Sequence, residues 1–169
     1  MAYTTHEMSS THSGEEMALR AIDFVERYCS IAVEPIVLIN ELDGGHQSLR
    51  LHRGPVIDII AVHDLYLDAD IPETGNWRQG VEDKVVAVGG NYWAQGKDRF
   101  RVTYEAGYED LPVALEILIE EIEDYAVAWE GATGLRREQF GSDYAWEAAI
   151  ASDAEMAPLI QRLNLWRRL

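Results

Sequence analysis

The sequence predicts an α+β fold, in which a small, mainly antiparallel β region is flanked by an N-terminal helix, a long central helix and a C-terminal helix. Changes in the spacing of apolar residues predict this fold. Up to Tyr28 and from Pro112 onwards, apolar residues recur at helical spacing, whereas between Val33 and Tyr104 they fall in short alternating runs. Turn-forming residues separate those runs, as is typical of antiparallel strands. At 169 residues, the chain is expected to form one domain with extended ends.

The first predicted element is an amphipathic helix. Residues 1–12 are polar and are expected to form a flexible N-terminal end. Ser13 stands three residues before Glu16, which is the spacing of a capping box, so a helix is expected to begin there and to end near Tyr28. Because one face of this helix is apolar, we expect it to dock on another element. That face consists of Met17, Ala21, Phe24, Val25 and Tyr28.

The middle of the chain predicts short strands joined by turns. Residues 56–67 are rich in β-branched and apolar side chains, which is typical of a central strand. Gly44-Gly45 and Gly89-Gly90 are expected to form hairpin turns. The expected strands are residues 36–39, 48–52, 56–67, 84–88, 91–93 and 99–104.

The stretch Tyr-Glu-Ala-Gly-Tyr-Glu-Asp-Leu-Pro at residues 104–112 joins the β region to the central helix. Pro112 suits the first helical turn, where its missing N–H costs nothing, and Glu109 and Asp110 favour the positive end of the helix dipole. Gly131 and Gly134 are expected to end this helix. Its apolar stripe is Leu115, Leu118, Ile119, Ile122, Tyr125, Ala126 and Trp129.

The predicted organisation has four segments. They are the flexible end 1–12, a core at residues 13–131, an extended arm at residues 132–152 and a C-terminal helix at residues 153–169. The last segment reverses the charge of the chain, because residues 156–169 hold three arginines and no acid. This helix either packs on its own domain, with basic side chains at its negative end, or anchors in an acidic or amphipathic groove of another protein.

The charge of the chain excludes several classes of function. Thirty Asp and Glu against 14 Lys and Arg give a net charge of −16, which repels nucleic acid and acidic membranes. No run of 18 apolar residues is present, so no membrane span is expected. With Cys29 as the single cysteine, no internal disulfide forms, and a reducing compartment fits.

No pattern in the sequence predicts chemistry. The glycine pairs lack the Lys-Ser/Thr of a phosphate-binding loop, and His46, His52 and His63 lack the spacing of zinc ligands. Cys29 ends an apolar helix and is expected to be a small buried residue. The acids of the central helix are expected to form its solvated face. We therefore predict no catalytic, cofactor-binding or metal-binding residue and no enzymatic activity.

The order of five stretches is more informative than any one of them. They read FVERYC, LRLHRGPVIDIIAV, FRVTYEAGYEDLPVALEILIEEI, GLRREQFGSDYAWE and LIQRLNLWRRL. This order resembles the head–tail connector (adaptor) proteins of long-tailed double-stranded DNA phages and gene transfer agents, over about residues 14–169. The matching positions are Leu49, Leu51, Pro55, Val56, Ile59, Val102, Tyr104, Gly107, Tyr108, Asp110, Leu111, Pro112, Glu138, Gly141, Asp143, Tyr144, Trp146, Arg167 and Arg168.

The resemblance implies a structural role in the virion neck, between capsid and tail, after assembly in the host cytoplasm. Members of this family form a ring, usually of twelve copies, below the portal, extend the DNA channel and receive the next neck or tail-completion protein. The expected partners are thus the portal protein, that next protein and further copies of the chain. DNA passes without sequence-specific binding, and no cofactor or membrane is involved.

The resemblance also implies which residues meet partners. Residues 156–169 would contact the portal, and the arm at 132–152 would reach neighbouring subunits. The candidate interface residues are Arg136, Arg137, Tyr144, Trp146, Leu159, Arg162, Leu163, Trp166, Arg167 and Arg168. The β region is larger than in the smallest members of the family, and a long portal-inserting tail is expected to be absent, because the sequence ends directly after Arg-Arg-Leu.

Three other functions stay open at this point. One is a head-completion stopper or tail-completion protein, which belongs to the same neck. Another is an acidic DNA-mimic inhibitor, which requires acids spaced like phosphates on one surface, whereas the acids here are dispersed along the chain. The third is an enzyme whose site is too diffuse to recognise in the sequence. Removing residues 156–169 is expected to abolish portal attachment and to leave the subunit folded.

Overall fold

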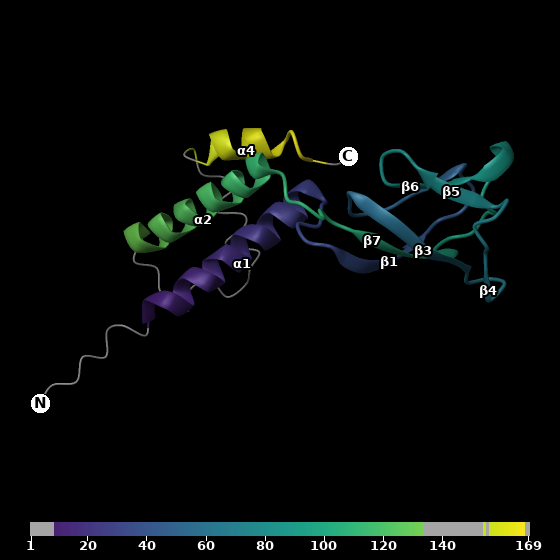
Figure 1. The fold of residues 1–169 in the computed structure, drawn as a ribbon, viewed down its shortest axis with the longest axis horizontal. Coiled ribbons are helices and arrows are strands. Elements are labelled where there is room, and N and C mark those ends of the chain that lie inside the picture. The colour runs from purple at the N-terminus through teal and green to yellow at the C-terminus, as the bar shows by residue number, and fades with distance from the viewer. Residues whose placement is uncertain (1–8, 134–153, 155, 168–169) are drawn as a thin grey trace, which may run out of the picture. The chain divides into compact units, whose positions relative to one another are not determined.

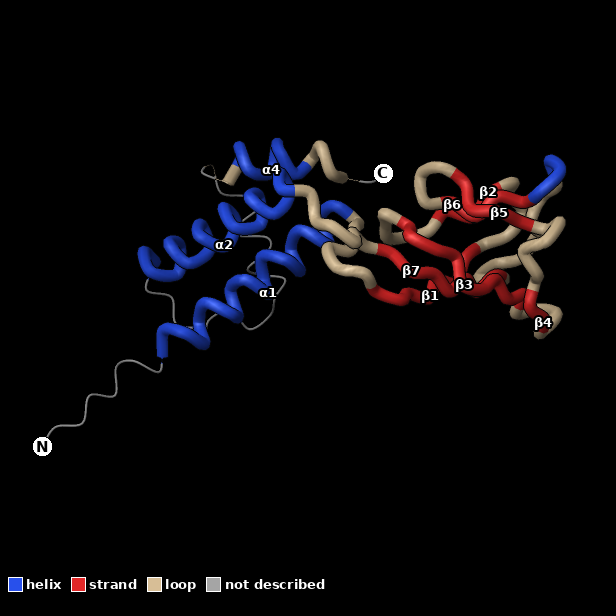
Figure 2. The backbone as a smooth tube through the Cα atoms, viewed as in Figure 1, coloured by secondary structure: helices blue, strands red, loops and turns tan. Residues whose placement is uncertain are grey.

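The chain divides into a helical unit and a β unit, which Figures 1 and 2 distinguish by their helices and strands. The computed structural model describes residues 9–133, 154 and 156–167. The helical unit contains the described residues of Met1–Cys29 and Pro112–Arg167, and the β unit contains Ser30–Leu111. The expected arm at 132–152 lies outside the described residues, apart from its first two positions.

Two long helices form most of the helical unit. Helix α1 spans Ser9–Cys29 and helix α2 spans Val113–Thr133, and the two pack side by side (Figure 1). Both predicted apolar stripes are confirmed, because their described members are buried or half-buried in the contact. The expected helix start at Ser13 is wrong, because α1 already begins at Ser9.

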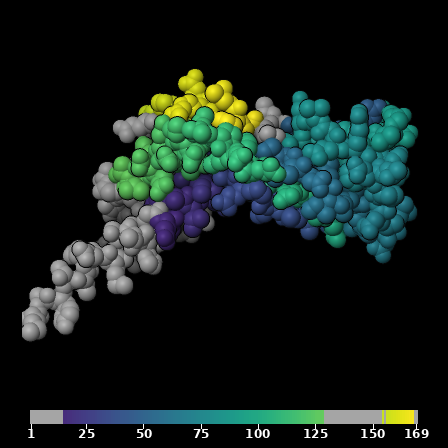
Figure 3. All heavy atoms as spheres, in the orientation of Figure 1, coloured from purple at the N-terminus to yellow at the C-terminus, as the bar shows by residue number. Residues whose placement is uncertain are grey.

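A third helix, α4, is shorter than the C-terminal helix that the sequence predicts. It spans Ala157–Leu163 and contacts both α1 and α2, and its contact with α2 is visible in Figure 3. Pro158 suits the first turn, which explains why the helix begins there. After Leu163 the hydrogen bonds change to i→i+3 spacing, from Leu165 N–H to Arg162 O at 3.1 Å and from Trp166 N–H to Leu163 O at 2.9 Å, so the helix ends in tight turns.

The β unit contains two antiparallel sheets, where the sequence predicts a single sheet. The larger sheet has the order β1-β7-β3-β4, with β1 at Ile36–Leu42, β7 at Phe100–Ala106, β3 at Val56–Asp64 and β4 at Ala69–Asp70. The smaller sheet has the order β2-β6-β5, with β2 at Ser48–Arg50, β6 at Lys84–Ala87 and β5 at Trp77–Gly80. The prediction of a central strand from residue 56 onwards is confirmed, since β3 pairs with both β7 and β4.

The two glycine pairs do not form hairpins, and this part of the prediction is wrong. Strand β1 pairs with β7 and not with β2, so Gly44-Gly45 does not join two paired strands. Instead, these glycines lie against the backbone of a distant segment. Gly44 N–H donates to Gly96 O at 2.8 Å, and Gly45 N–H donates to Trp93 O at 2.9 Å. Val88–Gly90 is a short 3-10 helix. Residues 91–93 are not a strand, and the sequence missed β5.

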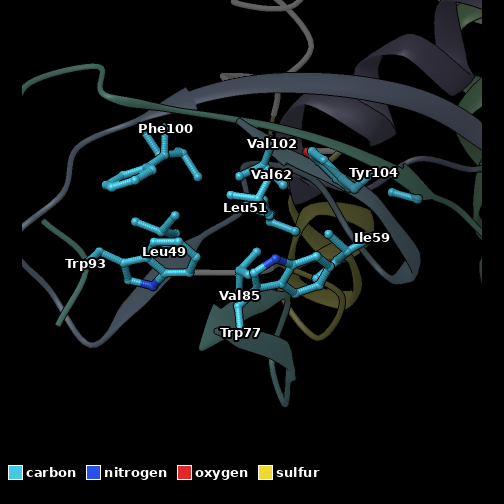
Figure 4. Packing of buried hydrophobic residues seen from close by; sticks show 12 residues of the cluster. Leu49, Leu51, Ile59, Val62, Trp77, Val85, Trp93, Phe100, Val102 and Tyr104 are labelled. Atoms are coloured by element: carbon cyan, nitrogen blue, oxygen red, sulfur yellow. The ribbon is translucent and has the colours of Figure 1, made fainter. Parts of the chain in front are cut away.

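The core of the β unit lies between the inner faces of its sheets (Figure 4). Leu49 and Leu51 alternate inward, as predicted, and pack with Trp77 and Val85 against side chains of β3 and β7. Trp93 meets Phe100 edge to face, with ring centroids 4.9 Å apart. Trp77 and Trp93 are therefore core residues, whereas Tyr92 is exposed.

The stretch at residues 104–112 is a packed junction. Tyr104 is fully buried; its hydroxyl donates to Asn40 Oδ1 at 2.9 Å and accepts from Arg53 N–H at 3.3 Å, and burial raises the pKa of this phenol. Gly107 has a φ of +134° and donates its N–H to Pro55 O at 2.9 Å. The local structure thus supports a packing role for Tyr104.

Candidate interaction surfaces

The C-terminal segment is held on its own helical unit by contacts along its length. Met156 and Leu163 are fully buried. The Cys29 thiol donates to Leu163 O at 3.5 Å, and Tyr28 Oη donates to Asn164 Oδ1 at 2.9 Å. This is the first of the two arrangements that the sequence left open, in which the segment packs on its own chain.

The predicted interface residues of this segment differ in their exposure. Leu163 is fully buried and packs inside the helical unit, whereas Leu159 and Trp166 are half-buried. Arg162 is exposed and forms an ion pair with Glu121 of α2. Arg167 is exposed and lies over the Tyr28 ring, 5.5 Å from its centroid. The remaining candidates lie outside the described residues, namely Arg136, Arg137, Tyr144, Trp146 and Arg168.

Leu165 is a surface residue that the sequence reasoning missed. Its side chain is 85% exposed, although it belongs to the same apolar run as Leu163. It lies beyond the end of α4, where the turn rotates it away from the helix stripe. The position of the helix end, and not the hydrophobicity of the run, decides which leucine faces outward.

Cys29 is a buried structural residue, as predicted. Burial raises the pKa of its thiol to about 11, and the charge of Arg167 lowers that value only in part. Because the thiolate is the nucleophile, this environment opposes covalent chemistry at Cys29.

We expect Cys29 to react with iodoacetamide at pH 8 at least about 100-fold more slowly in the folded protein than in urea. The shift of the thiol pKa from 9.0 to about 11 lowers the thiolate fraction by about two powers of ten, and burial restricts access further. Mass spectrometry of the adduct over time measures both rates. Equal rates in the two solvents would contradict a buried Cys29.

The turn after β3 is built around a buried ion pair. Asp64 is 3% exposed, and Arg99 Nη2 lies 2.8 Å from its Oδ2. Asp64 Oδ1 also accepts the N–H groups of Tyr66 at 2.9 Å and Leu67 at 3.3 Å. The bonds from Arg99 hold the pKa of the Asp64 carboxyl below its usual range. Since both carboxylate oxygens are occupied, this aspartate shapes the chain and is a poor candidate for a general base.

The outer face of the larger sheet carries exposed apolar side chains. Val37 and Ile39 on β1 are 56% and 61% exposed, and Ile60 on β3 is 53% exposed. At the far end of this face, Arg101 Nη2 lies 2.7 Å from Glu41 Oε1 on the neighbouring strand. The sequence predicted these strands without showing which of their apolar residues remain in solvent.

An open cleft of about 870 Å³ lies beside the β5–β6 turn. Arg50, His52 and Arg53 line it together with Glu82 and Asp83. Its carboxylates already have partners: Lys84 Nζ lies 2.7 Å from Glu82 Oε2 and lowers the pKa of Glu82, and Asp83 Oδ1 accepts Val56 N–H at 2.9 Å.

Within the described residues, no group of three or more His, Cys, Asp or Glu side chains is arranged to hold a metal ion. His63 bonds through Nδ1 to Asp70 at 2.8 Å and through Nε2 to Asp68 at 3.3 Å, and these bonds raise its pKa. No helix among the described residues is long and apolar enough to span a bilayer.

No protein-family model and no curated protein matches the sequence. Solved structures do match. A chain in the neck of a native gene transfer agent particle, computed with C12 symmetry, aligns with a TM-score of 0.61 and 17% identity over 93% of this chain and 82% of that chain. A chain in the neck of an empty particle, computed with C6 symmetry, gives a TM-score of 0.62 and 15% identity over 100% and 84%.

A chain from the virion of a native gene transfer agent particle aligns with a TM-score of 0.58 and 16% identity over 95% of this chain and 79% of that chain. This chain has the fold of those neck chains. The resemblance inferred from the order of the motifs is thereby confirmed at the level of the fold, over nearly the full length of the chain.

Proposed function

We propose that the chain is a structural head–tail connector subunit, an adaptor, of the virion neck. Copies of it form a ring below the portal, extend the DNA channel and offer a docking surface for the next neck or tail component. The observation that carries this proposal is the likeness in fold to neck chains over at least 93% of this chain. The order of the sequence motifs supports the same function independently.

The charge of the chain suits a channel through which DNA passes. Tight DNA binding requires Lys and Arg contacts to phosphates. A subunit with a net charge of −16 instead repels the backbone, so an acidic channel wall lets DNA slide without holding it.

Electron microscopy of the purified protein with a gene transfer agent or phage portal ring tests this function. The expected result is a ring of this chain bound directly to the portal. Binding only to a portal that already carries another adaptor would identify a stopper or tail-completion protein. Absence of binding in both cases would contradict a neck function, and inhibition of a DNA-binding enzyme would then support the DNA-mimic alternative.

The portal contact belongs to the exposed side of the C-terminal segment in this proposal. Leu165 supplies an exposed apolar side chain, and Arg162 and Arg167 supply positive charge in an otherwise acidic chain. Because Met156 and Leu163 are buried, deletion of residues 156–169 would open the core of the helical unit. This revises the expectation that such a truncated subunit stays folded, so surface substitutions are the sharper test.

We expect the double substitution Leu165→Ser and Arg167→Glu to weaken portal binding at least about tenfold, which corresponds to about 1.4 kcal/mol. The change removes one apolar contact and reverses one charge on an exposed surface. Leu19→Ser is the matched control, since Leu19 is 67% exposed on α1 of the same unit. Biolayer interferometry with immobilised portal measures the affinities. Equal losses in control and test variants would contradict a specific role for the C-terminal segment.

A further inference from the structure

The turn after β3 presents a rigid apolar knob. Tyr66 and Leu67, the turn knob, are 61% and 70% exposed. Tyr66 is nevertheless fixed, because its hydroxyl donates to Lys97 O at 3.1 Å and the Arg99 guanidinium lies 5.1 Å from its ring centroid. A side chain that is already immobile loses little entropy when it binds, which is a property of interface anchors.

A second apolar surface lies on the outer face of the same sheet. Val37, Ile39 and Ile60 form this apolar strip, with Thr103 of β7 lying opposite Ile39 in the register. Strand β1 is an edge strand, and β4 forms the other edge. Free edges are normally protected by charge or shortness. The two-residue β4 with Asp70 follows this rule, whereas the seven-residue, apolar β1 does not.

Charge restricts which partner can cover these surfaces. Two copies of a chain with a net charge of −16 repel each other, so they can meet only where acids are few or compensated. Beside the knob, Asp64 is paired with Arg99, and Asp68 and Asp70 share His63. At the end of the strip, Glu41 is paired with Arg101.

The remaining charges near the two surfaces complement each other. Asp58 and Glu105 lie on the same face as the strip, and the described residues supply neither of them with an ion pair. Lys97 lies beside the knob, and its side chain is 84% exposed with only a 4.0 Å contact to Asp98. A knob placed on the strip of another copy therefore brings a cation to two carboxylates.

Symmetry decides between the possible arrangements of two copies. A surface that packs on itself gives a two-fold dimer, whereas a closed ring requires two different surfaces that meet head to tail. The apolar strip lies on the outer face of the sheet, from β1 to β3, whereas the knob lies in the turn beyond the end of β3, so the two are different surfaces. We propose that, in the ring assumed by the proposed function, the turn knob of each subunit packs on the apolar strip of the next copy of this chain.

Single charged substitutions on each surface test this contact. Leu67→Lys places a charge in the turn knob, and Ile39→Lys places a charge in the apolar strip. Each substitution is expected to weaken self-association at least tenfold. Val81→Lys is the matched control, because Val81 is 88% exposed in the β5–β6 turn of the same unit and belongs to neither surface. Sedimentation velocity measures assembly, with and without the portal ring as a template, and circular dichroism verifies folding.

Mixing the two variants distinguishes head-to-tail packing from every symmetric contact. The Ile39→Lys variant keeps its knob and the Leu67→Lys variant keeps its strip, so the mixture is expected to form dimers and nothing larger. Oxidation of a double variant, Leu67→Cys with Ile39→Cys, is expected to give a ladder of covalently linked subunits. Cys29 is buried and does not compete.

Normal assembly of both lysine variants, or absence of the ladder both with and without portal, would overturn the inference. A mixture that remains monomeric would also overturn it. These outcomes are distinct from failure of the proposed function, which shows as the wild-type chain failing to form a ring on the portal by microscopy. A ring that forms normally with both lysine variants leaves the connector function intact and removes only this contact.

Discussion

Substitution of Gly107 by alanine is expected to lower the free energy of unfolding by about 3 kcal/mol or more. An added Cβ would lie 2.2 Å from Glu34 O and 2.7 Å from Pro35 N. These are backbone atoms, so they cannot move aside as the end of a side chain does. Overpacking of this kind costs about 1–3 kcal/mol, and a side chain at φ +134° adds backbone strain of about 1–3 kcal/mol.

The surrounding chain prevents relaxation at this glycine. Gly107 N–H is bonded to Pro55 O at 2.9 Å on one side, and the Glu34–Pro35 backbone lies against its Cα on the other. The turn that follows β7 is therefore fixed by a close approach of two main chains. Because Gly107 and the Glu34–Pro35 backbone both belong to the β unit, the substitution is expected to disturb that unit first.

Gly75→Ala is the matched control for Gly107→Ala. Gly75 has a φ of +80°, but an added Cβ would meet no atom within 4 Å, so only the backbone strain of about 1 kcal/mol applies. Urea unfolding followed by tryptophan fluorescence includes the β unit, since two of the five tryptophans, Trp77 and Trp93, are buried there. A shift of the midpoint at constant slope measures the difference. Equal effects of the two alanines would show that the Glu34 contact contributes nothing.

The helices of this fold could be predicted from the sequence because their signals are local. Apolar side chains at helical spacing identified the buried faces of α1 and α2, which are confirmed by the burial of Phe24, Val25, Leu118 and Ile122. The ends were harder to place: Ser13 and Glu16 have the spacing of a capping box, yet α1 begins four residues earlier, at Ser9.

The pairing of the strands could not be predicted, because a period of two does not say which strand lies beside which. Gly44-Gly45 has the composition of a hairpin turn, yet its role is a close approach: a Cβ on Gly44 would lie 1.8 Å from Ala94 O. The same local sequence serves either purpose, and the partner of β1 lies far away in the chain at β7.

The candidate surfaces also could not be predicted, because they depend on contacts between residues far apart in the sequence. Residues 56–67 were predicted as one strand, which placed Tyr66 and Leu67 inside the sheet. The strand ends at Asp64 because this carboxylate bonds to the next backbone N–H groups and to Arg99, which is 35 residues away. A single strand pattern gives no indication of such a long-range partner, so the exposed knob emerges only from the structure.

Replacement of Asp64 by alanine is expected to destabilise the protein by about 3 kcal/mol. Arg99 is only 14% exposed in the pair with Asp64, and removing one partner of a buried pair leaves the other charge without compensation. The N–H groups of Tyr66 and Leu67 also lose their acceptor. Glu41→Ala is the matched control, because the Glu41–Arg101 pair is exposed and is expected to contribute at most about 1 kcal/mol.

A second substitution separates the charge from the hydrogen bonds. Combining Asp64→Ala with Arg99→Met removes the buried cation and is expected to recover part of the lost stability, since a buried pair can be replaced by apolar groups at little net loss. The turn would still lack the Asp64 acceptor for its backbone. The double variant is thus expected to be more stable than Asp64→Ala and still to assemble poorly. Full recovery of assembly would contradict a role for Asp64 in shaping the knob.

The pH dependence of stability provides an independent measure of the Asp64 pair. Arg99 lowers the pKa of Asp64 in the folded state, so the folded protein binds its proton more weakly than the unfolded chain does. The resulting stabilisation is complete above the unfolded pKa of about 3.9 and is lost as the pH falls through the lower folded value. Urea midpoints measured between neutral and strongly acidic pH are therefore expected to fall more steeply below pH ~4 for the wild type than for Asp64→Asn. If the urea midpoints of the two proteins fall equally steeply at acidic pH, Asp64 has a normal pKa in the folded state and the turn is held by its backbone alone.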